Sequence, residues 1–245
     1  MESNDLLKKR IKELSLRAYE KGYHTFTEFL NMDEISVLVT TSNDNEYRLY
    51  GGYDGAERCV AGFGADICNN EYPIACIKIE PIQQKFADKL GHRDFLGSLM
   101  NLGINRNTLG DIVINDNIGY LFCLNTMSEY IVNNLNKVKH TSVICSITKE
   151  VPEFLLKKPE STEIIISSTR VDVVAASVYH LSRNTVTQLI NREQIFINSK
   201  IAYKESLMLK EGDTVSVRGH GKFIYNGVLR QTKKGKAVAE IKIFT

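Results

Sequence analysis

The chain has 245 residues, of which 43% are hydrophobic and 24% charged, and this composition is typical of a globular protein rather than a disordered one. The amino terminus is polar, and no apolar run approaches the roughly 18 residues that a membrane helix needs. We therefore expect a cytoplasmic protein of two or three small domains, without a signal peptide or a membrane-spanning segment.

The formal net charge of +2 hides an asymmetry along the chain. Residues 163–245 contain 13 Lys and Arg against 7 Asp and Glu, whereas residues 1–162 contain 18 against 22. A basic excess in one region is expected of nucleic-acid binding, although a solvated charged surface gives the same count. The five cysteines are scattered without a Cys-x-x-Cys pair, which indicates neither a disulfide framework nor a zinc site and favours burial for most of them.

Residues 1–72 predict a helical or mixed segment. Ser3 to Glu20 reads as an amphipathic helix, because four apolar residues recur on one face among several lysines and arginines. A packed helix with a solvated basic side is favoured there over a direct nucleic-acid contact. Strands are expected at 47–50 and 59–63, and the glycine-rich stretch 51–58 between them lacks the Gly-Lys-Ser/Thr ending of a phosphate loop, which favours a turn.

Residues 73–148 predict a regular series of elements: strand, helix, two strands around a turn, helix and strand. Their expected ranges are 74–79, 92–102, 111–114, 119–124, 128–138 and 142–147. This order is the ferredoxin-like βαββαβ arrangement shared by RNA-recognition (RRM-like) folds, and it predicts a four-stranded antiparallel sheet backed by two helices. The fold class is therefore α+β. Two prolines and mixed charges make residues 149–162 the expected linker.

The central sheet matches the base-stacking pattern of RNA-recognition domains poorly. Tyr120 and Phe122 fit the third-strand pattern, but the first strand, 74–79, contains no aromatic residue. We therefore expect this domain chiefly to position its C-terminal neighbour rather than to stack bases.

Residues 163–245 predict a compact helix-helix-strand unit followed by a hairpin. The first short helix is expected to be capped by Ser168 or Thr169, with Asp172 in its first turn, and the second by Ser182. On the second helix the apolar stripe through Val186 is expected to pack inward, which leaves Arg183 facing outward.

A basic rim is predicted around this unit, with its cations near one another. Val215 and Val217 alternate inward on a strand that sends Arg218 outward, and a hairpin with a cationic tip follows. Guanidinium forks and helix N-termini both match phosphate oxygens. The candidate RNA ligands are Arg170, Arg183, Asn184, Thr185, Arg192, Asn198, Lys200, Lys204, Arg218, Lys222, Lys233, Lys234 and Lys236.

Four motifs in this unit stand in a fixed order. They are Thr169-Arg170-Val171-Asp172, Leu181-Ser182-Arg183-Asn184-Thr185, Ile195-Phe196-Ile197-Asn198 and Glu211-Gly212-Asp213-Thr214-Val215-Ser216-Val217-Arg218-Gly219. The series resembles the αL (S-four-type) RNA-binding module, which implies a binder of structured RNA. Glu193 and Ser199 stand where that module usually has glycine, and this departure leaves the geometry of two turns open.

A wider resemblance covers nearly the whole chain. It includes Gly51-Gly52-Tyr53 with Ala56-Glu57-Arg58, residues 92–104 and Leu109-Gly110-Asp111-Ile112, together with the C-terminal unit. These features resemble the YlmH family of bacterial RNA-binding proteins. The resemblance implies a non-enzymatic, ribosome-associated protein that recognises the large subunit carrying a tRNA during rescue of stalled translation, and whose gene often lies near cell-division genes.

No catalytic motif accompanies these features. His92-Arg93-Asp94 is similar to a kinase catalytic loop, but Leu99 stands where that loop needs Asn, so a capped helix start is the better interpretation. No histidine pair has ligand spacing, and no nucleophile motif is present. We therefore expect no enzymatic activity, no cofactor and no metal site.

The expected partners are structured RNA (rRNA and tRNA) and the large ribosomal subunit, with no membrane partner and a monomeric chain. Two alternatives remain open at this point. One is a cell-division-linked scaffold with accessory RNA binding, and the other is an RNA-modifying enzyme with an unrecognised site.

Overall fold

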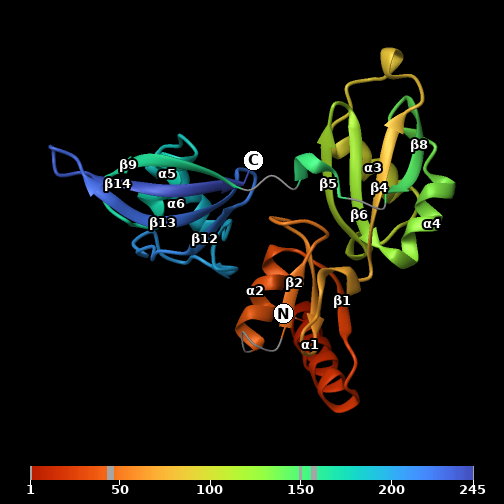
Figure 1. Cartoon of the computed structure of the whole chain (residues 1–245), viewed down its shortest axis with the longest axis horizontal. Helices are drawn as coiled ribbons and strands as arrows, with labels where there is room; N and C mark the ends of the chain where they lie inside the picture. Colours follow the sequence, from red (N-terminus) through yellow and green to blue (C-terminus); the bar gives the residue numbers. More distant parts are fainter. Residues whose placement is uncertain (1, 43–46, 149–150, 156–158, 245) are drawn as a thin grey trace. The chain divides into compact units, whose positions relative to one another are not determined.

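The computed structural model describes residues 2–42, 47–148, 151–155 and 159–244. The chain divides into two compact units, Met1–Leu156 and Lys157–Thr245 (Figure 1). In these described ranges no helix combines the length and the apolar character that crossing a membrane requires.

The first unit begins with a helix packed on a small sheet. Its elements are α1 (Glu2–Lys21), β1 (Thr25–Leu30), α2 (Met32–Thr41), β2 (Tyr47–Tyr50) and β3 (Cys59–Phe63). The strands form an antiparallel sheet in the order β1-β3-β2. Ile11, Leu14 and Ala18 of α1 are buried in the shared core, which confirms the expected amphipathic helix. The mixed segment that follows α1 is the strand β1 and the helix α2.

A capping box starts α2. The Asn31 side chain accepts hydrogen bonds from the Asp33 and Glu34 backbone N–H groups, and the Glu34 carboxylate accepts one from the Asn31 N–H. These bonds satisfy N–H groups that a helix start leaves without intrahelical partners.

The second half of this unit holds a larger sheet. Its main elements are β4 (Ile74–Pro81), α3 (His92–Asn101), β5 (Leu109–Asn115), β6 (Ile118–Leu124), α4 (Asn125–Asn134), β7 (Lys137–Val138) and β8 (Thr141–Thr148). Short 3-10 helices lie at η1 (Asn69–Glu71), η2 (Gln84–Phe86), η3 (Arg106–Thr108) and η4 (Glu153–Leu155). The expected order of strands and helices is present, and the antiparallel sheet runs β5-β6-β4-β8-β7.

One helix boundary of this domain was predicted wrongly. The helix expected to continue to Val138 ends at Asn134, and Val138 instead lies in β7, which adds a fifth strand to the sheet that was expected to have four. Val138 pairs with Thr141 through a turn in which Lys139 has a φ of 54°, and the Val138 side chain is fully buried. The gain from burying Val138 in a hairpin outweighs continuation of the helix.

The start of α3 agrees with the interpretation of His92-Arg93-Asp94 as a capped helix. The Gly91 backbone N–H donates to Oδ2 of Asp94 at 2.8 Å, and Asp94 lies in the first turn of the helix. The carboxylate therefore has a local structural role that accounts for its position in the sequence.

The second unit has two short helices on a six-stranded sheet. Its elements are β9 (Glu160–Ile166), α5 (Val171–Val178), α6 (Arg183–Asn191), β10 (Ile195–Ile197), β11 (Lys200–Ile201), β12 (Asp213–Val217), β13 (Gly221–Gln231) and β14 (Ala237–Phe244). The sheet runs β11-β10-β12-β13-β14-β9. Val215 and Val217 face the helices and are buried there, as the alternation predicted.

The expected linker at 149–162 ends too late. Residues 160–162 belong to β9, where Glu160, Ser161 and Thr162 pair with residues of β14. Their polar side chains are exposed on an edge strand, and for that reason the sequence looked like a linker. Residues 149–150 and 156–158 of the expected linker lie outside the described residues.

Candidate nucleic-acid interface

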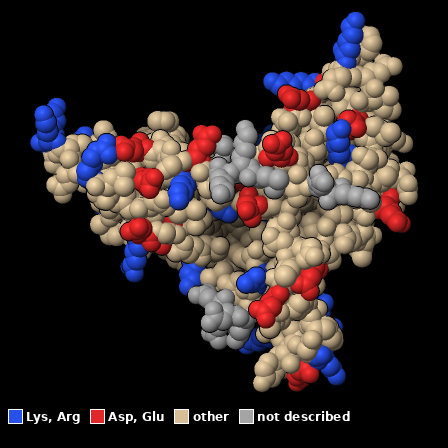
Figure 2. Space-filling view, viewed as in Figure 1, with Lys and Arg blue, Asp and Glu red and all other residues tan. Residues whose placement is uncertain are grey.

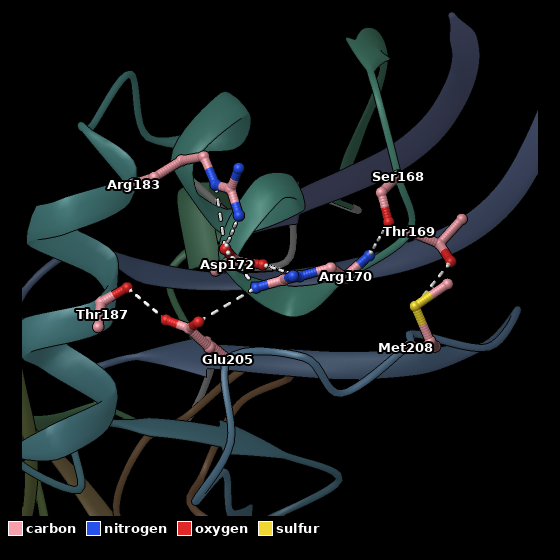
Figure 3. Close-up of polar contacts among 8 residues, drawn as sticks. All are labelled: Ser168, Thr169, Arg170, Asp172, Arg183, Thr187, Glu205 and Met208. Carbon is pink, nitrogen blue, oxygen red and sulfur yellow. Dashed lines mark hydrogen bonds and ion pairs between the residues drawn. The ribbon is translucent and has the colours of Figure 1, made fainter.

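A buried carboxylate organises the start of both helices in the second unit. Asp172, in the first turn of α5, is only 1% exposed. Arg170 approaches it side-on, with Nε 2.9 Å from Oδ1 and Nη2 3.1 Å from Oδ2 (Figure 3). This two-bond geometry fixes the orientation of both side chains.

Arg183, the first residue of α6, binds the same carboxylate. Its Nε and Nη2 atoms lie 3.0 and 2.6 Å from Oδ2 of Asp172, although 59% of the Arg183 side chain is exposed. The expectation that Arg183 only faces outward is therefore wrong in part, because two of its nitrogens hold α6 against α5. Both arginines were predicted as RNA ligands, and both are anchored by Asp172.

The electrostatics of Asp172 result from two opposing effects. Burial by itself would raise the pKa of the Asp172 carboxyl, but hydrogen bonds from Arg183 and Arg170 outweigh burial and hold that pKa below its ordinary value. Asp172 therefore carries a negative charge over a wider pH range than a solvated aspartate.

A second carboxylate extends the cluster to the loop before β12. Glu205 lies 3.4 Å from Nη2 of Arg170 and accepts a hydrogen bond of 2.9 Å from the Thr187 hydroxyl of α6 (Figure 3). We call Arg170, Asp172, Arg183 and Glu205 the arginine clasp. Its two positive and two negative charges cancel, so the clasp positions α5, α6 and the loop without adding net charge.

The caps of the two helices differ from each other. Arg170 is the N-cap residue of α5 and provides no side-chain cap, so the expected cap at Ser168 or Thr169 is wrong. Ser168 instead accepts from the Arg170 N–H at 3.3 Å, and the Thr169 hydroxyl points to Sδ of Met208. The cap at Ser182 is confirmed, because its Oγ accepts from the Thr185 N–H at 3.0 Å.

The other candidate ligands near α6 are mostly exposed. Asn184, Arg192, Lys200 and Lys204 are exposed, and Thr185 is half-buried. Asn198 has a structural role in addition, because its amide donates to Asp213 and its Oδ1 accepts from the Thr214 N–H. These two hydrogen bonds tie the turn after β10 to the start of β12.

Not all the predicted cations lie together. Lys222 alternates with the buried Phe223 along β13, so Lys222 points to the sheet face opposite the helices. Arg218 lies over the ring of Phe196, 5.7 Å from its centroid, and Lys222 lies 5.1 Å from that of Phe244. The expectation of one shared rim is therefore wrong for Lys222, which strand alternation separates from the helix cations, whereas the Arg218 N–H donates to the Gln194 carbonyl, close to the end of α6.

The cationic hairpin tip is present as expected. Lys233, Lys234 and Lys236 are exposed in the turn between β13 and β14, and Gly235 has a φ of 74° there. The tip is the blue group at the far left of Figure 2, while the rest of this unit's visible surface mixes both signs of charge. In the part of the chain that the structure describes, none of these three lysines forms an ion pair.

The glycine-rich stretch 51–58 is hydrogen-bonded to the carboxylate of Asp111, a residue to which the sequence alone assigned no role. Asp111 of β5 accepts hydrogen bonds from the Tyr53 hydroxyl at 2.9 Å, the Glu57 N–H at 2.7 Å and the Arg58 N–H at 3.1 Å. The turn between β2 and β3 is therefore fastened to the central sheet.

Arg58 completes this attachment through carbonyl groups. Its Nε donates to the Leu109 carbonyl at 2.9 Å, and its Nη2 donates to those of Phe29 and Arg106 at 3.1 and 3.3 Å. Burial lowers the pKa of the Arg58 guanidinium, against the attraction of Glu34 and Asp111. Burial together with the charge of Arg58 lowers the pKa of Arg106 to about 10. These motif residues form a structural network.

Of the two aromatic residues of β6, Tyr120 and Phe122, the second is covered by the same stretch 51–58. Phe122 is fully buried and stacks on Tyr53 with ring centroids 5.0 Å apart and an interplanar angle of 29°. Gly52, with a φ of 102°, approaches Phe122 so closely that a Cβ would not fit there. Tyr120 is half-buried and meets Phe154 edge-on. Phe122 is thus inaccessible to a base.

Comparison with known proteins shows which domain and which protein this chain is similar to. Residues 68–151, which include the central sheet and its helices α3 and α4, match the family model described as "Putative RNA-binding domain in YlmH". Over 221 residues the chain is 28% identical to the "Ribosome-associated protein quality control protein P2" of Bacillus subtilis (strain 168), and the match covers 86% of this chain and 83% of that protein. The resemblance to the YlmH family inferred from the sequence is thereby confirmed.

One solved structure is also similar. It is the "Cell division protein ylmH from Streptococcus pneumoniae", with a TM-score of 0.48 and 17% sequence identity. The similarity covers 60% of this chain and 91% of that one.

Proposed function

We propose that this chain is a non-enzymatic binder of structured RNA that associates with the ribosome. The observation that carries the proposal is the match of residues 68–151 to an RNA-binding domain, joined to a second unit whose exposed cations include Arg192, Lys200, Lys204 and the hairpin tip. Solvated cations on a rigid scaffold attract a phosphate backbone without requiring a particular base sequence.

The finer assignment treats the central sheet as an RRM-like domain and residues 163–245 as an αL module. The strand order β5-β6-β4-β8, with helices α3 and α4, supports the first part. The second part is supported by the hydrogen bonds of Arg170 and Arg183 to Asp172, which join the Arg-x-Asp and Ser-Arg motifs at one carboxylate. In this assignment the arginine clasp is a positioning device, and the surrounding cations bind phosphate.

The proposed target is ribosomal RNA of the large subunit together with tRNA, bound by a monomer during rescue of stalled translation. The name of the Bacillus subtilis relative, which refers to ribosome-associated protein quality control, supports this context. The sequence motifs and the exposed cations support RNA as the partner, and the sequence matches no catalytic motif that would favour an enzyme instead.

Filter binding to large-subunit rRNA fragments and to tRNA tests the proposal. If about six phosphates are neutralised, the affinity should fall ~10³-fold or more between about 50 and 200 mM salt. An affinity that does not change with salt, or no binding at all, contradicts the proposal.

The cellular context has its own test. The protein should co-sediment with large ribosomal subunits from a lysate, and the complex should dissociate when the salt is raised. Co-sedimentation with division complexes and not with ribosomal subunits would instead favour the scaffold alternative.

A further inference from the structure

Residues 202–210, which form most of the loop between β11 and β12, expose large apolar side chains next to the arginine clasp. Tyr203 is 69% exposed, Met208 60% and Leu207 39%. Exposed apolar groups that lie together in one loop commonly mark a contact surface. We call this segment the tyrosine loop.

The tyrosine loop is anchored at both ends. Ala202 is 1% exposed and its N–H donates to the Ile195 carbonyl at 2.9 Å. Leu209 is 5% exposed and its N–H donates to the Thr169 carbonyl at 2.9 Å, while the Val171 N–H donates to the Leu207 carbonyl at 2.8 Å. The apolar side chains are thus presented by a pre-organised backbone, which lowers the entropic cost of binding a ligand.

Charge around the loop favours an anionic ligand. Within 202–210 the only acidic residue, Glu205, is already bound by Arg170 and Thr187, and beyond it Asp213 accepts from the Lys210 N–H and the Asn198 amide. Lys200, Lys204 and Lys210 are exposed in or beside the loop, and among the described residues none of the three forms an ion pair. An apolar surface bordered by solvated lysines is complementary to a nucleotide, which has a flat base and a phosphate.

Other aromatic residues of the second unit are less accessible. Phe196, Phe223 and Tyr225 are at most 2% exposed, and Tyr179 is half-buried. In the first unit Phe122 is covered by Tyr53. Tyr203 is therefore the most exposed aromatic side chain of the second unit within the described residues.

We propose that Tyr203 stacks on one unpaired base of the bound RNA, while Lys200 and Lys204 contact the phosphates beside that base. Sequence-specific RNA contacts favour bulges and loops, whose unstacked bases reach aromatic side chains. The inference rests on the proposed RNA-binding function and narrows it, since the preferred RNA then has an unpaired nucleotide beside a helical stem.

The test compares two RNA hairpins of equal length, one fully paired and one with a single bulged 2-aminopurine. The full-length protein should bind the bulged hairpin more tightly, and 2-aminopurine fluorescence should be quenched as the base stacks. Tyr203→Ala should lose roughly tenfold or more of the affinity for the bulged hairpin and abolish the quenching. Tyr203→Phe, which keeps the ring, should retain both.

Two controls separate stacking from folding and from general RNA binding. Tyr203→Ala should leave the melting temperature unchanged, because the side chain is 69% exposed, and should change affinity for the paired hairpin less than twofold. Tyr19→Ala, at an 88% exposed tyrosine in the first unit, should change neither affinity.

The possible failures are distinguishable. If the wild-type protein binds neither hairpin, the proposed function fails. If it binds both hairpins equally with the expected salt dependence, or if Tyr203→Ala leaves the bulged-hairpin affinity and quenching intact, only the stacking inference is overturned. Unchanged bulged-hairpin affinity and quenching in Tyr203→Ala would favour a protein partner for the tyrosine loop.

Discussion

Nη2 of Arg183 lies 2.6 Å from Oδ2 of Asp172, a buried carboxylate that Arg170 also holds through two hydrogen bonds. The pair joins the first residue of α6 to the first turn of α5, eleven residues earlier in the chain. A cation that the sequence presents as an RNA ligand therefore also fixes the packing of two helices. This double role changes what substitutions at Arg183 should do.

We expect Arg183→Ala to lower the melting temperature of the second unit, because it removes two hydrogen bonds from a buried carboxylate. Arg183→Lys should recover part of the loss, since lysine keeps the charge but not the planar fork. Calorimetry on the full chain provides the measurement. An unchanged melting temperature for Arg183→Ala would show that Arg170 alone is sufficient to hold Asp172.

Asp172 should make stability depend on pH in the acid range. Its pKa is lower in the folded chain than its ordinary value of 3.8, so its contribution to stability is present above that pH and is lost as the pH falls through the folded pKa. In urea unfolding, the wild-type protein should therefore lose more stability than Asp172→Asn as the pH falls below about 4. The exposed pair Glu163–Arg230 provides a control, because solvent screens it and Glu163→Gln should change this profile little.

Two turns should be stabilised by glycine. Glu193 and Ser199 have φ angles of 56° and 63°, in the left-handed region. Glycine adopts this region without steric cost, so Glu193→Gly or Ser199→Gly should each raise the free energy of unfolding by up to about 1 kcal/mol. Alanine at either position should give no such gain. A lower melting temperature for both glycine variants would contradict this reasoning.

The two aromatic residues of β6 should respond differently to truncation. Phe122→Ala should destabilise the first unit by about 3–5 kcal/mol, because the ring is fully buried against Tyr53 and truncation leaves a cavity. Tyr120→Ala should leave the fold intact and change RNA affinity less than threefold. A loss above tenfold with an unchanged circular-dichroism spectrum would assign base stacking to Tyr120.

The hairpin tip should contribute to affinity without affecting stability. Replacing Lys233, Lys234 and Lys236 with alanine should weaken binding equally for different RNA sequences, and the slope of affinity against salt should fall by about 1 for each phosphate that the tip binds. The melting temperature should not change, because the three side chains are exposed. As a control of equal charge, alanine at Lys8, Lys9 and Lys12 of α1 should leave binding within about twofold, since all three are exposed on the basic side that the sequence predicts to be solvated. Equal losses in the two triple variants would show that the tip only adds general positive charge.

Local patterns in the sequence determined most of the helices and strands. The apolar stripe of α1, the cap at Ser182 and the alternation through Val215 and Val217 each depend on residues within a few positions of one another. The order of elements in the central domain was determined in the same way. These features are predictable because backbone periodicity and capping are short-range effects.

The tertiary structure decided the features that join distant residues. The polar residues of β9 form a strand only because β14, more than 70 residues later, pairs with them. Asp111 fastens a turn more than 50 residues earlier, and this contact helps to bury Phe122. Likewise, whether Arg183 faced solvent or a carboxylate depended on where α5 placed Asp172. No local pattern encodes such partners, since hydrogen-bonding and burial energies depend on which surfaces the folded chain brings together.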